Sequence, residues 1–183
     1  MTTRYIDLNT VASMRTPRPS VLTTDQIRRG NAVHEAAHAL VGLSYGMNLA
    51  RIRLTEEAAV GGGLAVSGVT TWNRCRVDEV EFAVQCAAGA VAEQRLFDEA
   101  GLAARVDGAY DEDLAVVVLV RSGFRVVETG PVQQGVVAWD QVTEMAHRCV
   151  GNLWPQITRV AEALLAAPAA VLEADQVCVL TRS

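Results

Sequence analysis

The sequence predicts a mainly helical α+β domain with about five helices and a small two- or three-stranded β element. Apolar residues recur at helical spacing over several long stretches of the chain. Between the first two of these stretches lie two short segments that have the character of strands. The chain has 183 residues, half of them hydrophobic, which is enough for one domain with a substantial core.

The first helix is expected to begin after Thr23, because Thr23 and Gln26 have the spacing of a capping box. Its apolar pattern continues to about Ser44. Residues 1–22 mix Thr, Pro, Arg and Ser without sustained periodicity, which indicates a flexible N-terminal arm. The domain itself is therefore expected to comprise residues 23–183.

The next segments are two strands followed by three helical stretches. Residues 49–55 alternate apolar and basic side chains, and residues 63–71 follow a glycine-rich turn. Helical patterns are then expected over residues 77–97, 108–123 and 140–167. Pro155 interrupts the last of these, so we expect a kink or two abutting helices there.

Composition excludes several classes of function. The net charge of −5, from 16 basic and 21 acidic residues, argues against a nucleic-acid surface. All the basic residues are arginines, so a phosphate-binding loop of the G-x-x-x-x-G-K-[ST] type is absent. Neither a membrane span of roughly 20 apolar residues nor a signal peptide is recognisable, which favours a cytoplasmic location. The four scattered cysteines are expected to be reduced thiols.

The segment AVHEAAHALVG, residues 32–42, contains the H-E-x-x-H arrangement of zinc hydrolases. On a helix, His34 and His38 lie about 40° apart on one face, so both imidazoles can reach one cation. Glu35 projects to the side, where it can take a proton from a water that zinc acidifies. The alternative is a helix with two surface histidines. The apolar flanks disfavour it, because burying a histidine without a partner costs about 1–3 kcal/mol.

A zinc hydrolase site usually has three protein ligands. The third histidine, His147, lies on a helical pattern where a lone histidine is more often structural. The acidic cluster formed by Asp111, Glu112 and Asp113 is the better source, because a carboxylate suits zinc and the helix beginning there would hold it rigidly. The cluster also fits a helix start that satisfies the dipole. Both roles are compatible, with Asp111 as cap and Asp113 as ligand.

Glu93 is a polar residue inside an alanine- and glycine-rich helical segment, CAAGAVAEQRLF. In that setting it could accept the free N–H of a ligating histidine. The alternative is a surface glutamate paired with Arg95 or Arg105.

Several segments of the sequence resemble the FtsH-type zinc metalloprotease domain. AVHEAAHALVG is similar to its H-E-A-G-H-A-[LV]-[VL]-G helix, although Ala37 replaces the usual glycine. AAGAVAEQRLF resembles the family segment G-G-R-A-A-E-E-L-[IV]-F, and DGAYDEDLAVVV resembles T-G-A-S-N-D-L-x-x-A. The stretch LWPQITRVAEALLAAPAAVLEADQVCVL resembles the closing helices. The similarity spans roughly residues 26–180.

The resemblance implies a zinc-dependent endopeptidase that acts on flexible or unfolded polypeptides. His34 and His38 would bind Zn²⁺ and Glu35 would be the catalytic base. The family's third ligand is the aspartate of N-D-L, which matches Asp113 by the leucine that follows it. The loop before it is one residue longer here, so Asp111 is the alternative third ligand.

In zinc proteases the substrate commonly pairs with a sheet edge beside the metal helix. The candidate edge consists of Leu64, Ala65, Val66, Ser67, Gly68, Val69 and Thr70. The alternative is a structural hairpin that only covers the helix.

The family's ATPase module and membrane helices have no counterpart in this sequence, so we expect activity that does not depend on ATP. Members of the family assemble as six-fold rings. This chain could therefore form a homo-oligomer or act with a separate partner protein, and the sequence does not decide between the two. Two other functions also stay open. One is a non-catalytic or regulatory binding module on the same fold, and the other is a narrow processing protease for one partner protein.

Overall fold

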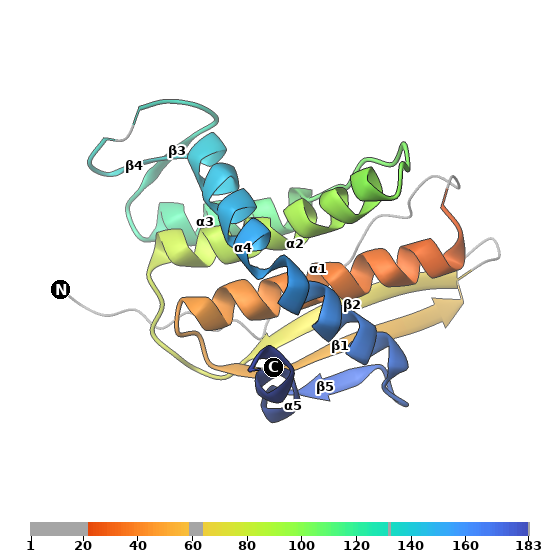
Figure 1. Ribbon diagram of the computed structural model, residues 1–183. Helices are drawn as coiled ribbons and strands as arrows, with labels where there is room; N and C mark the ends of the chain where they lie inside the picture. The colour runs from red at the N-terminus through yellow and green to blue at the C-terminus, as the bar shows by residue number, and fades with distance from the viewer. Residues whose placement is uncertain (1–21, 59–63, 132, 183) are drawn as a thin grey trace.

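The computed structural model describes residues 22–58, 64–131 and 133–182, and these form five helices and two small sheets (Figure 1). The helices are α1 (Thr24–Ser44), α2 (Glu79–Glu99), α3 (Ala109–Arg121), α4 (Trp139–Ala166) and α5 (Ala174–Thr181). The strands are β1 (Leu49–Ala58), β2 (Leu64–Trp72), β3 (Arg125–Val127), β4 (Val136–Ala138) and β5 (Val171–Glu173). The predicted class, a mainly helical α+β fold, is confirmed.

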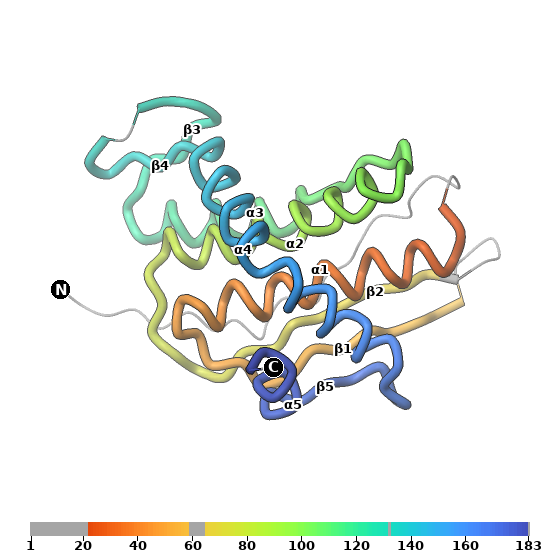
Figure 2. Tube along the Cα trace, in the orientation of Figure 1, coloured from red at the N-terminus to blue at the C-terminus, as the bar shows by residue number. Residues whose placement is uncertain are grey.

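Helix α1 forms the centre of the molecule. Its predicted capping box is present, since Gln26 N donates to Thr23 Oγ1 over 3.2 Å and Thr23 N donates to Gln26 Oε1 over 2.8 Å. Every residue from Gly30 to Gly42 is buried. The reason is visible in Figure 2, where α2 and α4 cover one side of α1 and the strands β1 and β2 cover the other. A polar side chain on this stretch therefore needs a partner inside the protein.

The three-stranded sheet is antiparallel, with the order β2-β1-β5. On β1, Leu49, Ile52 and Leu54 are buried while Arg51 and Arg53 are exposed, which is the alternation that the sequence predicted. Within the described part of the chain, β2 pairs only with β1, so its other edge is an open strand edge. Strand β2 also packs against α1.

Small residues let α2 approach α1 closely. A Cβ added at Gly30 would lie 2.6 Å from Glu93 Oε1 and 2.9 Å from Phe97 Cζ. Helix α2 also carries short buried residues, including Ala83, Ala88 and Ala92, and its Gly89 lies against His34 and His38 of α1. Because the two helix axes lie close together, a polar side chain on α2 can reach the interior face of α1.

The tail forms one long helix rather than two abutting ones. Helix α4 runs from Trp139 to Ala166 with Pro155 inside it. Buried Val150 precedes the proline and buried Ile157 follows it, so tertiary packing holds both halves of the helix. The parallel pair β3–β4 and the strand β5 are elements that the pattern analysis did not predict.

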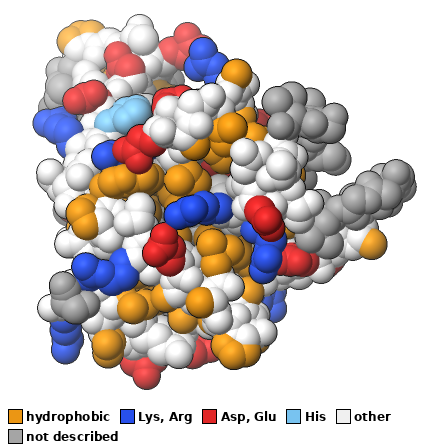
Figure 3. Space-filling model, turned by 45° about the vertical axis from the view of Figure 1, so that its right-hand side comes forward, with side chains coloured by type: hydrophobic (Ala, Val, Ile, Leu, Met, Phe, Trp, Pro, Cys, Tyr) orange, Lys and Arg blue, Asp and Glu red, His pale blue; other side chains and the backbone are white. Residues whose placement is uncertain are grey.

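The surface combines charges of both signs with apolar side chains on the face shown in Figure 3. Arg29 Nη2 lies 3.0 Å from Glu162 Oε1 and links α1 to α4, and Arg28 Nε lies 2.6 Å from Glu56 Oε1 on β1. Such exposed pairs contribute at most about 1 kcal/mol each, so the core rather than the surface holds the elements together. No helix among the described residues has the length and apolar character needed to cross a bilayer. The arm expected over residues 1–22 lies outside the described part, apart from Leu22.

Candidate metal centre

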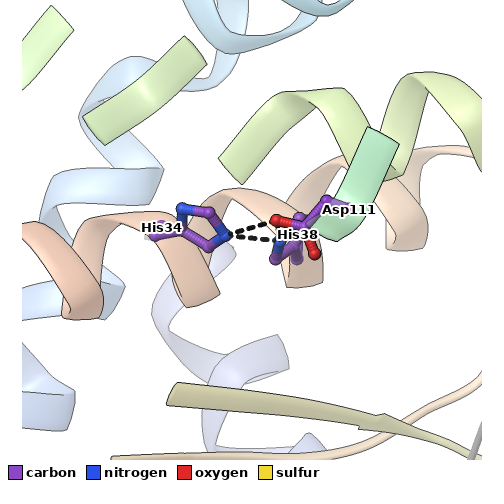
Figure 4. A group of neighbouring side chains, drawn as sticks. All are labelled: His34, His38 and Asp111. Carbon is purple, nitrogen blue, oxygen red and sulfur yellow. Dashed lines mark hydrogen bonds and ion pairs between the residues drawn. The ribbon is translucent and has the colours of Figure 1, made fainter. Parts of the chain in front are cut away.

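Two imidazoles from one turn of α1 point at each other across a short gap. His34 Nε2 and His38 Nε2 are 2.8 Å apart, and the residues are only 2% and 6% exposed (Figure 4). Both come from the fully buried part of α1. The sequence prediction that residues 34 and 38 share one helix face is confirmed by this geometry.

A carboxylate from the first turn of α3 completes the group. Asp111 Oδ2 lies 3.1 Å from His34 Nε2 and 3.6 Å from His38 Nε2. Among the described residues this is the one group of three side chains able to hold a metal ion, with its ligand atoms all within 4.8 Å of one another. His147 lies exposed on α4 and does not contribute.

The structure brings Asp111, rather than Asp113, to the imidazoles. Asp113 is exposed and lies outside the group, so the first choice of third ligand is corrected to the alternative. The physical reason is helical geometry: α3 already begins at Ala109, and residues two apart on a helix point about 200° apart. Only one of the two aspartates can then face α1.

Hydrogen bonds at the far side of each ring fix which nitrogen faces the group. His38 Nδ1 lies 2.8 Å from the carbonyl oxygen of Gln85, which can only accept, so this Nδ1 carries the proton. His34 Nδ1 lies 3.2 Å from Glu93 Oε2, and a carboxylate again accepts. In the neutral imidazoles both Nε2 atoms therefore present lone pairs towards each other.

Glu93 takes the position that the sequence analysis considered for it. It is fully buried, with 0% exposure, and contacts a ring nitrogen of His34. The alternative, a surface glutamate paired with arginine, does not describe it; Arg95 instead pairs with Glu99 over 2.8 Å.

The arrangement fits a metal ion. Two imidazole lone pairs and a carboxylate oxygen converge, and such a set is stable only with a cation, either a proton or a metal, between them. Ligand atoms around a tetrahedral zinc ion lie about 3.3 Å apart, and the three separations here are 2.8, 3.1 and 3.6 Å. A Cβ at Gly89 on α2 would overlap both Nε2 atoms, so a glycine keeps this space open.

The electrostatics of the group favour positive charge. Burial acts to lower the pKa of His38, but the charge and hydrogen bond of Asp111, with Glu35 and the Gln85 carbonyl, outweigh it, so the pKa is raised above 6.5. Burial acts to raise the pKa of Asp111, yet the two imidazoles hold it well below its usual range. A proton or a metal ion is therefore stabilised between these side chains.

Glu35 lies beside the group and faces β2. It is 3% exposed, and Thr70 Oγ1 donates to its Oε2 over 2.8 Å. A Cβ at Gly68 would overlap the Glu35 carboxylate. The base predicted from the motif is thus held between α1 and the edge strand.

A cleft opens over Glu35, His38 and Asp111. Of the strand predicted to bind substrate, Gly68, Val69 and Thr70 line this cleft. Of the earlier residues, Ala65 is exposed, Val66 is buried and Ser67 is half-buried, and none of them lines it. The remaining wall is mostly apolar and is formed by Trp72, Phe82, Gln85, Cys86, Tyr110 and Leu114.

Sequence reasoning missed the Gln85 carbonyl, Gly89, Tyr110 and the contact between Thr70 and Glu35. A backbone carbonyl leaves no signal in the sequence. Gly89 does leave one, because it stands in the small-residue run around Glu93 that already indicated tight packing.

No protein-family model and no curated protein matches this chain.

Proposed function

We propose that this protein is a zinc-dependent endopeptidase of the FtsH type that hydrolyses peptide bonds of flexible or unfolded polypeptides. One observation carries the proposal: His34, His38 and Asp111 converge, and two of them, His38 and Asp111, line one cleft together with Glu35. The order of the similar motifs along the chain supports it. The 183 residues contain no lysine that could complete a P-loop, so we test cleavage without added ATP.

The ligands would be His34 Nε2, His38 Nε2 and Asp111 Oδ2. Three protein ligands of nitrogen and oxygen type are characteristic of catalytic zinc. When bound, zinc supplies Lewis acidity that polarises a carbonyl and acidifies a water molecule. Glu93 and the Gln85 carbonyl hold the imidazole rings in the tautomer that such a ligand set requires.

Glu35 would perform the proton transfers. Its carboxylate accepts a proton from the attacking water, whose oxygen bonds to the carbonyl carbon of the substrate. When the C–N bond breaks, the same carboxylate returns the proton to the leaving amine nitrogen. The apolar side chains in the cleft wall, among them Trp72, Phe82 and Leu114, would limit the access of bulk water and so strengthen these interactions.

The open edge of β2 supports a polypeptide as substrate. An extended peptide can pair with the free backbone groups of an edge strand, and Gly68–Thr70 run along the cleft. A peptide adopts that conformation only if it is not already folded. The proposed substrates are therefore flexible or unfolded chains.

The test is Glu35→Gln, which keeps the size of the side chain and removes its basicity. We expect the variant to hold one equivalent of zinc by elemental analysis and to lose cleavage of casein assayed without ATP. Cleavage at the parent rate by Glu35→Gln would refute the proposal. Wild-type protein that binds zinc but cuts no flexible polypeptide would favour a non-catalytic module, and cleavage of one partner protein alone would favour a processing protease.

A further inference from the structure

We infer that Thr70 on β2 is a positioning residue for the Glu35 carboxylate. The inference rests on the proposed function, because it assigns a role in the reaction to a side chain that is not itself a metal ligand. It also changes the role of Thr70, which the sequence analysis placed among the residues that contact substrate.

The contact is specific. Thr70 Oγ1 lies 2.8 Å from Glu35 Oε2 and 3.1 Å from the Glu35 carbonyl oxygen, so the hydroxyl sits over both the side chain and the backbone of one residue. A hydrogen bond to a carboxylate is charge-assisted and therefore short and strong. Because a carboxylate accepts several hydrogen bonds, this one leaves Glu35 able to take a proton.

A long glutamate side chain needs such an anchor. Glutamate has three side-chain torsions, and fixing them costs rotamer entropy. Thr70 comes from a different element, β2, whose position is set by antiparallel pairing with β1, with Ile52 opposite Thr70. A donor on a rigid neighbouring strand therefore selects one Glu35 conformer that α1 alone would not select.

Gly68 provides the space that the Glu35 carboxylate occupies beside Thr70. It precedes Thr70 by two residues, so both lie on the face of β2 that meets α1. A Cβ at position 68 would overlap the Glu35 carboxylate. The strand thus offers a slot at Gly68 and a donor at Thr70, and the carboxylate occupies that slot.

The first test compares three variants of the full chain. Thr70→Val keeps the shape and removes the donor, Thr70→Ser keeps the hydroxyl, and Thr71→Val is a control on the opposite face of the same strand. For Thr70→Val we expect kcat to fall about 10- to 100-fold, with KM within about twofold of the parent. Thr70→Ser should recover most of kcat, and Thr71→Val should match the parent. A Thr70→Val enzyme with parental kcat, or a serine variant as impaired as the valine variant, would overturn the inference.

The second test needs neither metal nor turnover. In metal-free protein, urea unfolding midpoints are measured for Thr70→Val, Glu35→Ala and the double variant. We expect the shift of the double variant to be smaller than the sum of the two single shifts, since both changes remove the contact between Thr70 Oγ1 and Glu35 Oε2. Fully additive shifts would show that the two side chains do not interact.

The combined results separate the two hypotheses. If Glu35→Gln abolishes cleavage while Thr70→Val does not reduce it, the inference fails and the proposed function stands. If Glu35→Gln cleaves at the parent rate, the proposed function is wrong, and so is the role of Thr70 in positioning a catalytic base. The unfolding cycle then reports separately whether Thr70 holds Glu35.

Discussion

Replacing Gly89 by alanine should impair metal binding although residue 89 is not a ligand. Gly89 lies on α2 directly against the two imidazoles of the candidate metal centre. An alanine Cβ there would lie 2.5 Å from His38 Nε2 and closer still to His34 Nε2. Atoms of this kind are in van der Waals contact at about 3.5 Å, so α2 or an imidazole must move by about 1 Å.

The size of the effect follows from this overlap. Overpacking by one methyl group in a close-packed interior costs about 1–3 kcal/mol. If the metal-free variant relieves the overlap by turning an imidazole, metal binding has to restore the ligand geometry against the same free energy. A cost of about 1–3 kcal/mol corresponds to a Kd for zinc that is about 5- to 150-fold weaker.

The assay is competitive titration of zinc against a chromophoric chelator, with circular dichroism to show that the variant is folded. Gly151→Ala is the matched control, because it makes the same substitution on α4 at a site with nothing within 4 Å of the new Cβ. The control should bind zinc like the parent and be more stable by about 0.5–1 kcal/mol, the helix-propensity gain of alanine over glycine. Parental zinc affinity in folded Gly89→Ala would refute the reasoning.

Three further predictions concern the ligand set and its surroundings. Asp111→Asn should lower the zinc content well below one equivalent, whereas Asp113→Asn on the same helix should leave it intact; equal effects of the two changes would contradict the structure. Protons compete with metal for His38 Nε2, whose pKa is raised above 6.5, so zinc affinity should fall by up to about tenfold per pH unit below that raised pKa. An affinity that is constant from about pH 8 to pH 5 would be inconsistent with this competition. Burial and the charge of Asp111 raise the pKa of the Cys86 thiol, so peptide mapping should show slower alkylation of Cys86 than of the three partly exposed cysteines. Equal alkylation of all four cysteines would show that the reagent reaches Cys86 in the cleft wall as easily as the other three.

The elements that sequence reasoning placed well are those determined locally. Helix α1 begins directly after its predicted cap at Thr23 and ends at Ser44, because a capping box and a run of small apolar residues are properties of neighbouring residues. Strand β5 has only three residues and is created by pairing with β1, with Leu172 opposite Ile52. A three-residue segment contains no pattern that indicates which distant strand it will pair with.

The same distinction applies to the candidate metal centre. The spacing of His34 and His38 on one helix already places both imidazoles on the same face. The choice between Asp111 and Asp113 depends on where α3 begins and how it is rotated towards α1, and matching by the following leucine ignores the additional residue in the loop. Glu93 was identifiable because an acidic side chain among alanines and glycines needs a buried partner. The contact of Thr70 with Glu35 depends on the position of β2 against α1, which is purely tertiary.

The geometry also bears on whether a bound metal would be catalytic or structural. A structural zinc site is closed by four protein ligands, whereas a catalytic site has three and keeps one position open. Within the described residues three possible ligand atoms converge here, and the buried Glu35 lines the same cleft as His38 and Asp111. A structural site has no need for a glutamate that is anchored by Thr70 and lines the same cleft. The position of this glutamate, more than the ligand set, is what favours hydrolysis over a structural role.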